Sequence, residues 1–208
     1  MQLIGRRSSV FTRMALMFAA ELGVPLPLEP IPDMNRTEPE FYAGNPALKL
    51  PVLRLDGSVL FGALTICRAI AERCNSPRLI VWPEQMTDIL SRNAQELVWH
   101  GMAAQVQIVM GTVVNALPAE NPFFVKLKTG FEGALGWLDA HVEAVVRGLP
   151  PRDLSLFEVS LYCLVEHLVF RKNLSVAPYS RLTDFCRDFR ERPAVRATEY
   201  RFDQPPTT

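Results

Sequence analysis

The sequence predicts a small mixed α/β unit followed by an all-helical unit. In the first 75 or so residues, strand-like and helical segments alternate in the order strand, helix, edge strand, loop, hairpin, helix, which fits a small mixed sheet with helices packed on it. Residues 75–78 and 81–83 contain polar residues and prolines and are interpreted as a linker. From Glu84 onward the apolar residues recur at helical spacing almost throughout. We therefore expect domains at 1–76 and 84–208.

The first unit opens with a strand and a helix. Residues 2–5 are typical of a short strand, and apolar residues at helical spacing predict a helix over 10–22. A serine stands just before this helix as a suitable N-cap, and Gly23 follows it as a suitable stop. The next segment, 24–32, carries four prolines, so only an edge strand or an extended stretch is compatible with it.

A loop, a hairpin and a second helix complete the first unit. Residues 33–46 are polar and indicate a loop with room for one helical turn. Strands are expected near 52–55 and 58–61, joined by Asp56-Gly57, a dipeptide that strongly favours a tight hairpin turn. A helix over 63–74 follows.

Pro51 stands at the start of the first hairpin strand, where it cannot donate to the ladder. A cis bond before it would turn the chain sharply and leave the backbone N–H and C=O of Leu50 free. Those two groups could then pair in strand fashion with an extended peptide ligand. An ordinary trans turn before a strand is the alternative.

The second half is predicted to be a helical bundle. Its third helix begins with a capping box, Ser155-Leu156-Phe157-Glu158, in which hydroxyl and carboxylate each satisfy a free N–H. That helix has little polar surface, which indicates the buried centre of the bundle. The tail 203–208 is polar and rich in proline, and we expect it to fray. The four predicted helices span 84–116, 122–146, 155–171 and 180–191.

Composition narrows the classes of partner and location. Lys plus Arg and Asp plus Glu each number 22, so the net charge is zero and no nucleic-acid footprint is expected. The four cysteines and three histidines lack the spacing of metal ligands, so no metal site is expected. No secretory signal pattern and no apolar run of membrane-spanning length stand out. We therefore expect a cytoplasmic protein that binds neither nucleic acid nor membrane.

The order of these features resembles the cytosolic glutathione S-transferase superfamily, and in particular its serine-type, bacterial-like members. Each signal is weak alone, but together they follow the family's order at similar separations over nearly the whole chain. The resemblance implies a thioredoxin-like domain at 1–76 and an all-α domain at 84–208. It rests on Leu3-Ile4-Gly5, Ser8-Ser9-Val10-Phe11-Thr12-Arg13, Asn45-Pro46, Lys49-Leu50-Pro51-Val52-Leu53, the capping box, and Phe189-Arg190-Glu191-Arg192-Pro193-Ala194-Val195.

The resemblance implies that Ser9 supplies the hydroxyl that activates the glutathione thiol. A hydroxyl at a helix N-terminus can donate to a thiolate, and the helix dipole and nearby N–H groups favour the anion. Ser8 is the second choice, because serine-type members differ by one position here. Plain N-capping is the alternative for both residues.

The rest of the glutathione site follows from the same resemblance. Leu50, before a cis Pro51, would pair its backbone with the cysteinyl part of glutathione. Lys49 lies near the same expected site and could meet a carboxylate of the tripeptide. The same holds for three arginines, of which the last is better explained as a structural helix residue: Arg6, Arg7 and Arg13.

One position departs from the family's pattern. After the hairpin, the family usually has Glu-Ser or Asp-Ser, which hold the γ-glutamyl end of glutathione, whereas this chain has Gly62-Ala63. The backbone N–H groups of these two residues can still bind a carboxylate at the helix start. The amine end has no evident partner, and Thr65 is a possible late substitute for the missing helix cap.

The sequence leaves more than one function open. The first is an enzyme that conjugates glutathione, as co-substrate, to small apolar electrophiles through a serine-stabilised thiolate, as a homodimer. The second is a non-catalytic binding or dimerisation module with an eroded glutathione site. A third, within the enzyme class, is glutathione-dependent isomerisation, ether cleavage or dehalogenation. Trp99, Met102 and Val106 are candidates for the substrate pocket, with packing of the bundle core or a subunit interface as the alternative.

Overall fold

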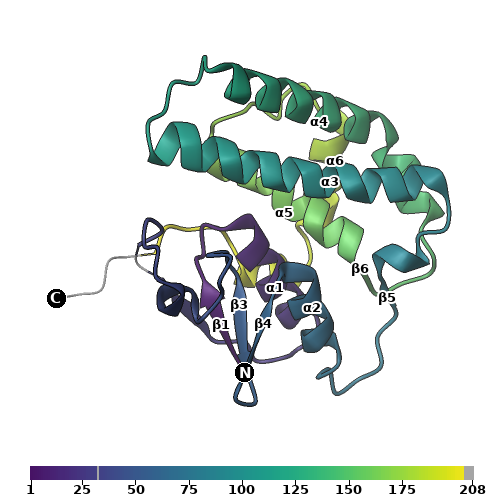
Figure 1. Ribbon diagram of the computed structural model, residues 1–208. Helices are drawn as coiled ribbons and strands as arrows, with labels where there is room; N and C mark the ends of the chain where they lie inside the picture. Colours follow the sequence, from purple (N-terminus) through teal and green to yellow (C-terminus); the bar gives the residue numbers. More distant parts are fainter. Residues whose placement is uncertain (32, 204–208) are drawn as a thin grey trace. The chain divides into compact units, whose positions relative to one another are not determined.

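The computed structural model describes residues 1–31 and 33–203. The chain divides into two compact units, coloured along the sequence in Figure 1. The first unit contains Met1–Arg78 together with the segment from Arg192 onward, and the second contains Leu79–Glu191. Pro32 and all of the predicted frayed tail except Asp203 lie outside the described residues.

The first unit is built on a four-stranded sheet in the order β2-β1-β3-β4, and Figure 1 labels β1, β3 and β4 of this sheet. The strands are β1 (Gln2–Gly5), β2 (Leu28–Pro30), β3 (Val52–Leu55) and β4 (Ser58–Phe61). β2 runs parallel to β1 at one edge, and the other pairs are antiparallel. The prediction that the proline-rich segment forms an edge strand is confirmed, and the mixed sheet is the thioredoxin-like arrangement.

Two helices pack against each other in this unit, α1 (Val10–Glu21) and α2 (Ala63–Ala71). α1 ends in a Schellman motif, in which the Val24 N–H donates to the Ala19 carbonyl at 2.9 Å. Gly23 takes the left-handed conformation that this ending needs, with φ +65°. The buried apolar side chains of the two helices and the sheet form the core of the unit, with Val10, Met14, Phe18, Leu53, Ile66 and Ile70 at its centre.

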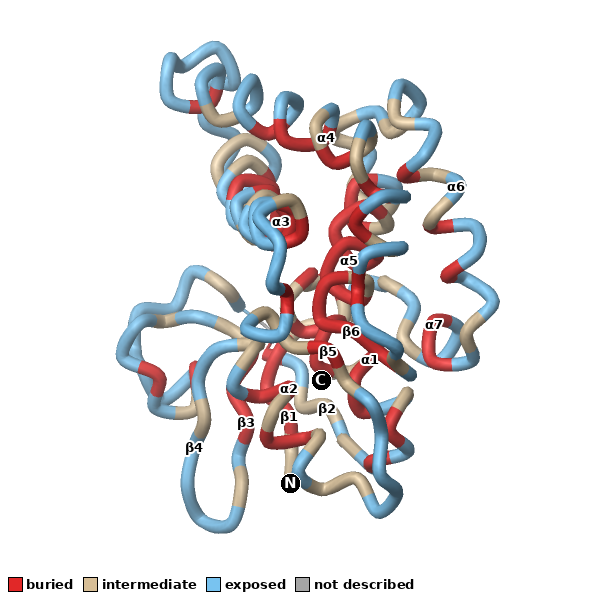
Figure 2. Tube along the Cα trace, turned by 90° about the vertical axis from the view of Figure 1, so that its right-hand side faces the viewer, coloured by how far each residue is buried: buried red, intermediate tan, exposed pale blue. Residues whose placement is uncertain are grey.

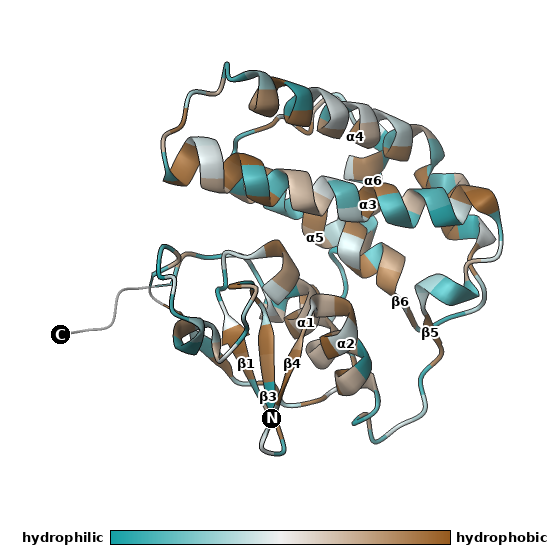
Figure 3. Ribbon diagram, viewed as in Figure 1, coloured by the Kyte–Doolittle hydropathy of each residue, from teal (hydrophilic) through white to brown (hydrophobic). Residues whose placement is uncertain are grey.

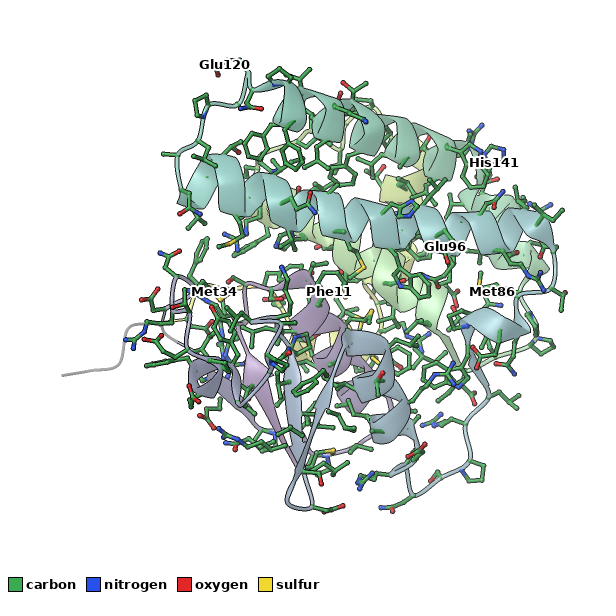
Figure 4. All side chains as sticks on the ribbon, in the orientation of Figure 1. Phe11, Met34, Met86, Glu96, Glu120 and His141 are labelled. Carbon is green, nitrogen blue, oxygen red and sulfur yellow. The ribbon has the colours of Figure 1, made fainter. Side chains whose placement is uncertain are left out.

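The segment between β2 and β3 holds one short 3-10 turn, η1 (Pro39–Tyr42), as expected from the sequence. Tyr42 is buried, and its hydroxyl lies 2.9 Å from the carbonyl oxygen of Met34, which Figure 4 labels, and 3.0 Å from that of Arg36. The Tyr42 side chain thus closes the polar loop onto the sheet. Its ring joins a small apolar cluster made of Ile4, Ile31, Tyr42 and Val52.

The second unit is a bundle of α3 (Ile89–Ile108), α4 (Pro122–Gly148), α5 (Leu156–Arg171) and α6 (Ser180–Phe189). α3 and α6 each pack against α4 and α5. Figure 2 shows α5 as mostly buried, which agrees with the prediction from its apolar sequence.

The predicted helix over 84–116 is wrong in detail. A 3-10 turn, η2 (Pro83–Gln85), comes first, and α3 begins separately because the Asp88 carboxylate accepts from the Ser91 N–H at 2.8 Å. At its other end the helix widens into a π-helical turn, η3 (Val109–Val114). Gly111 permits this corner, since a Cβ there would lie 2.2 Å from the Phe124 ring.

Of the two stretches expected to form the linker, residues 75–78 belong to the first unit, whereas residues 81–83 belong to the second unit, which begins at Leu79. β5 (Ile80–Val81) pairs in parallel with β6 (Leu154–Ser155), directly before α5. The Asp153 N–H donates to the Leu79 carbonyl at 2.8 Å, and the Leu79 N–H donates to the Asp153 carboxylate at 2.8 Å. The pairing joins residues more than seventy positions apart, so no local sequence signal marks it.

The predicted capping box of α5 is confirmed for Ser155 but not for Glu158. The Ser155 hydroxyl accepts from the Glu158 N–H at 3.1 Å, as predicted. The Glu158 carboxylate, however, accepts from the Ser155 hydroxyl at 2.6 Å and from Arg152 Nε and Nη2 at 2.6 and 2.8 Å. A nearby guanidinium is a stronger donor to a carboxylate than a backbone N–H, so Glu158 turns toward Arg152.

The C-terminal segment lies with the first unit, although the sequence placed it in the domain 84–208. A short helix, α7 (Pro193–Ala197), packs on α1. Arg192 donates from Nε and Nη2 to the two oxygens of Glu21, each at 2.7 Å. This bidentate pair and the burial of Ala194 and Val195 attach the segment to α1.

One segment is long and apolar enough to span a membrane by length and composition, which corrects the expectation that no such run exists. It runs over Ile89–Val114, and 39% of its most apolar window is buried. Figure 3 shows polar and apolar residues mixed along α3, and the exposed Glu96 lies on this helix (Figure 4). Its buried Gln95 and Gln105 are hydrogen-bonded to other helical residues of the unit and to Asn173. A core helix of a bundle passes the same test, and the packing of α3 on α4 and α5 fits that description.

Candidate functional site

The end of β1 is pressed tightly onto the start of α1. A Cβ on Gly5 would lie 2.5 Å from Thr12 Oγ1, so only glycine fits there without a shift. The Arg6 N–H donates to Thr12 Oγ1 at 3.4 Å, and the Ser9 N–H donates to the Arg6 carbonyl at 3.0 Å. Residues 6–9 therefore form a tight turn that sets the position of Ser9.

Ser9 is the N-cap of α1, with its Oγ accepting from the Thr12 N–H at 3.3 Å. The cap uses a lone pair of the oxygen and leaves the hydroxyl proton unused. No acceptor for that proton is found among residues 1–31 and 33–203, and Ser9 is partly exposed. Ser9 can thus cap the helix and donate to an anion at once, so the two roles weighed for it are compatible. Ser8, by contrast, is only 3% exposed.

The loop that leads into β3 is shaped by Asn45, which is buried. Asn45 Nδ2 donates to the Lys49 carbonyl at 2.8 Å, and Oδ1 accepts from the Ala47 N–H at 3.0 Å. The Leu48 N–H donates to the Asn45 carbonyl at 3.0 Å. This role of Asn45 was not anticipated from the sequence, although an asparagine beside a proline is a known signal for such a turn.

The Leu50–Pro51 peptide bond is cis, as the resemblance implied. Pro51 is buried, Leu50 is partly exposed, and Lys49 is exposed. Within the described part of the chain, no hydrogen bond reaches the N–H or C=O of Leu50. Leu50 therefore offers one free donor and one free acceptor just before β3.

α2 begins without a side-chain cap. Gly62 is the N-cap residue, with φ +85°, and no side chain accepts from the first-turn N–H groups. The suggestion that Thr65 substitutes as the cap is therefore wrong, because Thr65 lies inside the first turn and makes no capping bond. The free N–H groups of this turn, starting at Ala63, suit a carboxylate.

These three loops leave the sheet at the same end. Ile4 is paired with Val52, and Val52 with Phe61, across β1, β3 and β4. Neighbouring strands lie about 4.8 Å apart. Three features consequently lie side by side at this end of the sheet: the turn with Ser9, the cis bond before Val52, and the start of α2 after Phe61. The sequence alone did not establish this.

The three arginines near this end have charged or aromatic neighbours within the first unit. Arg6 Nε and Arg7 Nε lie 3.9 and 3.8 Å from the oxygens of Asp203. Arg13 is buried, and its guanidinium carbon lies 4.3 Å from the centre of the Tyr200 ring. The contacts of Asp203 and Tyr200 were not anticipated, because more than 180 residues separate the partners in each contact.

The proposed pocket residues lie in the second unit, on α3. Met102 is fully buried, whereas Trp99 and Val106 are partly buried. A Cβ on the adjacent Gly101 would lie 2.9 Å from atoms of Leu164 and Phe131, so this part of α3 is in close contact with α4 and α5. The burial of Met102 agrees with the alternative assignment, in which this residue packs within the bundle.

The N-terminal part of the chain is similar in sequence to a known protein family. Residues 8–73 match the family model "Glutathione S-transferase, N-terminal domain". No curated protein matches the chain in sequence.

Solved structures share the fold over the whole chain. A glutathione transferase family member from Pseudomonas fluorescens Pf-5 with bound glutathione has a TM-score of 0.76 at 20% identity, covering 95% of this chain and 98% of that one. A glutathione S-transferase from Methylobacterium radiotolerans in complex with glutathione sulfonate has a TM-score of 0.74 at 20% identity, covering 100% and 97%. One from Methylobacillus flagellatus with glutathione bound has a TM-score of 0.74 at 20% identity, covering 95% and 98%. Residues 8–73 are thus similar to the glutathione S-transferase N-terminal domain family, and the chain as a whole has the glutathione S-transferase fold.

Proposed function

We propose that this protein binds glutathione at the end of the sheet where the three loops meet, stabilises its thiolate with Ser9, and conjugates it to small apolar electrophiles in the cytoplasm. The observation that carries the proposal is the convergence of free polar groups of Ser9, Leu50 and Ala63 at one sheet end. Structures with the same fold hold glutathione or a derivative of it.

Each free group has a part of glutathione that it suits. The N–H and C=O of Leu50 match the backbone of the cysteinyl residue, in the manner of an added strand. The first-turn N–H groups of α2 match the γ-glutamyl carboxylate. The Ser9 hydroxyl donates to the thiolate, which the positive end of the α1 dipole also favours. Lys49, which is exposed, suits the other carboxylate of the tripeptide.

A non-catalytic binding or dimerisation module is the second candidate. The observation in its favour is the start of α2, where Gly62 and Ala63 supply neither the acid nor the hydroxyl of the usual pair. Two charge-assisted hydrogen bonds of about 1.5–3 kcal/mol each are then missing from the γ-glutamyl end. In either case we propose a homodimer, which sedimentation of the purified chain would reveal.

The test is titration calorimetry with glutathione. Saturable binding in the micromolar-to-millimolar range supports a working site, and no binding at high millimolar glutathione supports the module. Ala63→Ser restores one of the missing groups at a position with ordinary helical backbone, so it should raise the affinity about tenfold if the site is used. Ser58→Ala, at the opposite end of the sheet, is the control and should bind as wild type does.

A further inference from the structure

The chain returns from α7 to the turn that carries Ser9. Residues 198–203 run back along the first unit, drawn in yellow in Figure 1. The chain from Arg192 to Asp203 is held at two points before its end, by the bidentate pair of Arg192 with Glu21 and by the ring of Tyr200 over Arg13. The segment therefore brings a late carboxylate, that of Asp203, to residues 6–7.

Asp203 lies against the side chains of Arg6 and Arg7, and these two arginines are called the basic recess below. Its Oδ2 accepts from the Arg7 N–H at 3.0 Å. Its Oδ1 lies 3.8 Å from Arg7 Nε, and Oδ2 lies 3.9 Å from Arg6 Nε. The Asp203 side chain is only 8% exposed, while those of Arg6 and Arg7 are 25% and 35% exposed.

The recess is incompletely used by Asp203. A carboxylate can accept about four hydrogen bonds, yet the two guanidinium groups stay beyond hydrogen-bond distance of it. Arg6 Nε is buried and has no hydrogen-bond partner in the described chain. Two positive charges face one negative charge, so the recess keeps a positive excess that a better-placed carboxylate would exploit.

The recess also adjoins the proposed reacting centre. The Ser9 N–H donates to the Arg6 carbonyl, so Arg6, Arg7 and Ser9 belong to one tight turn. A thiolate bound at the Ser9 hydroxyl would therefore lie at the same turn of the backbone that carries both arginines. An electrophile that reaches this thiolate would approach the same turn.

We propose that Arg6 and Arg7 form a carboxylate-binding subsite, that Asp203 is its internal occupant, and that an electrophile bearing a carboxylate displaces Asp203 from it. This rests on the proposed glutathione chemistry and refines the electrophile from apolar to anionic. Asp203 then acts as a competitor within the chain, and it lowers the affinity for electrophiles that carry a carboxylate more than the affinity for uncharged ones.

The first experiment tests the subsite without glutathione. The melting temperature of Asp203→Ala is measured in acetate and in chloride at equal ionic strength. We expect the melting temperature of this variant to be higher in acetate than in chloride. The difference between the two salts should be smaller for wild type, because Asp203 occupies the recess there. Glu199→Ala, which removes an exposed carboxylate of the same segment, is the control and should respond as wild type does. Equal responses of Asp203→Ala to the two salts would overturn the subsite.

The second experiment tests the electrophile. Calorimetry compares S-carboxymethylglutathione with its uncharged isostere, S-carbamoylmethylglutathione. We expect Asp203→Asn to prefer the carboxymethyl adduct by about fivefold more than wild type does, the size of one partly exposed ion pair. The double variant Arg6→Gln, Arg7→Gln should lose the preference.

The outcomes separate the two proposals. An acetate effect with neither adduct bound would refute the glutathione function and keep the subsite. Equal binding of the two adducts by Asp203→Asn would refute the anionic electrophile while leaving glutathione binding intact.

Discussion

Replacing Ser9 separates its capping role from its role at the thiol. Ser9→Ala removes the acceptor of the Thr12 N–H, a bond of 3.3 Å. Loss of an N-cap costs about 1 kcal/mol, which corresponds to a melting temperature lower by about 2–4 °C in a chain of this size. Ser9→Asp keeps a good cap, so we expect it to melt near wild type.

The effect on the thiol is larger and depends on pH. A hydrogen bond to a charged group contributes about 1.5–3 kcal/mol, so losing the Ser9 donor should raise the pKa of bound glutathione by about 1–2 units. Below the wild-type pKa, the fraction of bound glutathione present as thiolate should then be lower in the variant by about tenfold or more. The difference disappears at high pH, where the thiol is ionised in both proteins. Ser9→Asp should be impaired at least as much, because a carboxylate donates nothing and repels the thiolate.

The assay is the pH profile of conjugation to one fixed electrophile, together with the ultraviolet absorbance of bound thiolate. Ser58→Ala is the matched control and should reproduce the wild-type profile. If Ser9→Ala lowers the melting temperature but leaves the pH profile unchanged, Ser9 is only a cap and the catalytic assignment is wrong.

Three further predictions concern stability. Ser155→Ala removes two partly buried hydrogen bonds with Glu158, so the free energy of unfolding in urea should fall by about 2 kcal/mol. A fall below about 0.5 kcal/mol would contradict the network. Gly62→Ala should lose about 1 kcal/mol in thermal denaturation because φ there is +85°, whereas Gly130→Ala, in the open middle of α4, should gain stability. The hydrogen bonds from Ser91 lower the pKa of Asp88 below its ordinary value of 3.8, so the Asp88 carboxylate stabilises the fold above pH 3.8 and this contribution is lost as the pH falls further. Asp88→Asn keeps the cap, so its unfolding free energy should depend less steeply on pH in this range. An equally steep dependence would refute the assignment.

Local chemistry made much of the first unit predictable. The prolines of 24–32 placed β2 at an edge because proline lacks an N–H for a central ladder. Asp56-Gly57 marked the hairpin because both residues adopt positive φ, at 49° and 79°. The serine and glycine that bound α1 act within a few residues of the helix ends.

The misses involve competition or distance. The start of α3 at Asp88 was hidden because the apolar periodicity continues through the 3-10 turn before it. Glu158 was given the backbone partner of a capping box, but a nearby arginine is a stronger donor. The β5–β6 pair consists of two short strands, too short for an alternating pattern to mark either of them.

The sequence by itself determined the elements of the first unit, the cis bond before Pro51 through family resemblance, and the serine at the start of α1, because each depends on neighbours along the chain. Only the tertiary structure decided that Ser9, Leu50 and Ala63 meet at one end of the sheet, since that follows from the register of Ile4, Val52 and Phe61. It also decided that Asp203 faces Arg6 and Arg7. Contacts between residues so far apart in the chain depend on the packing of whole elements, and no local pattern of residue types encodes them.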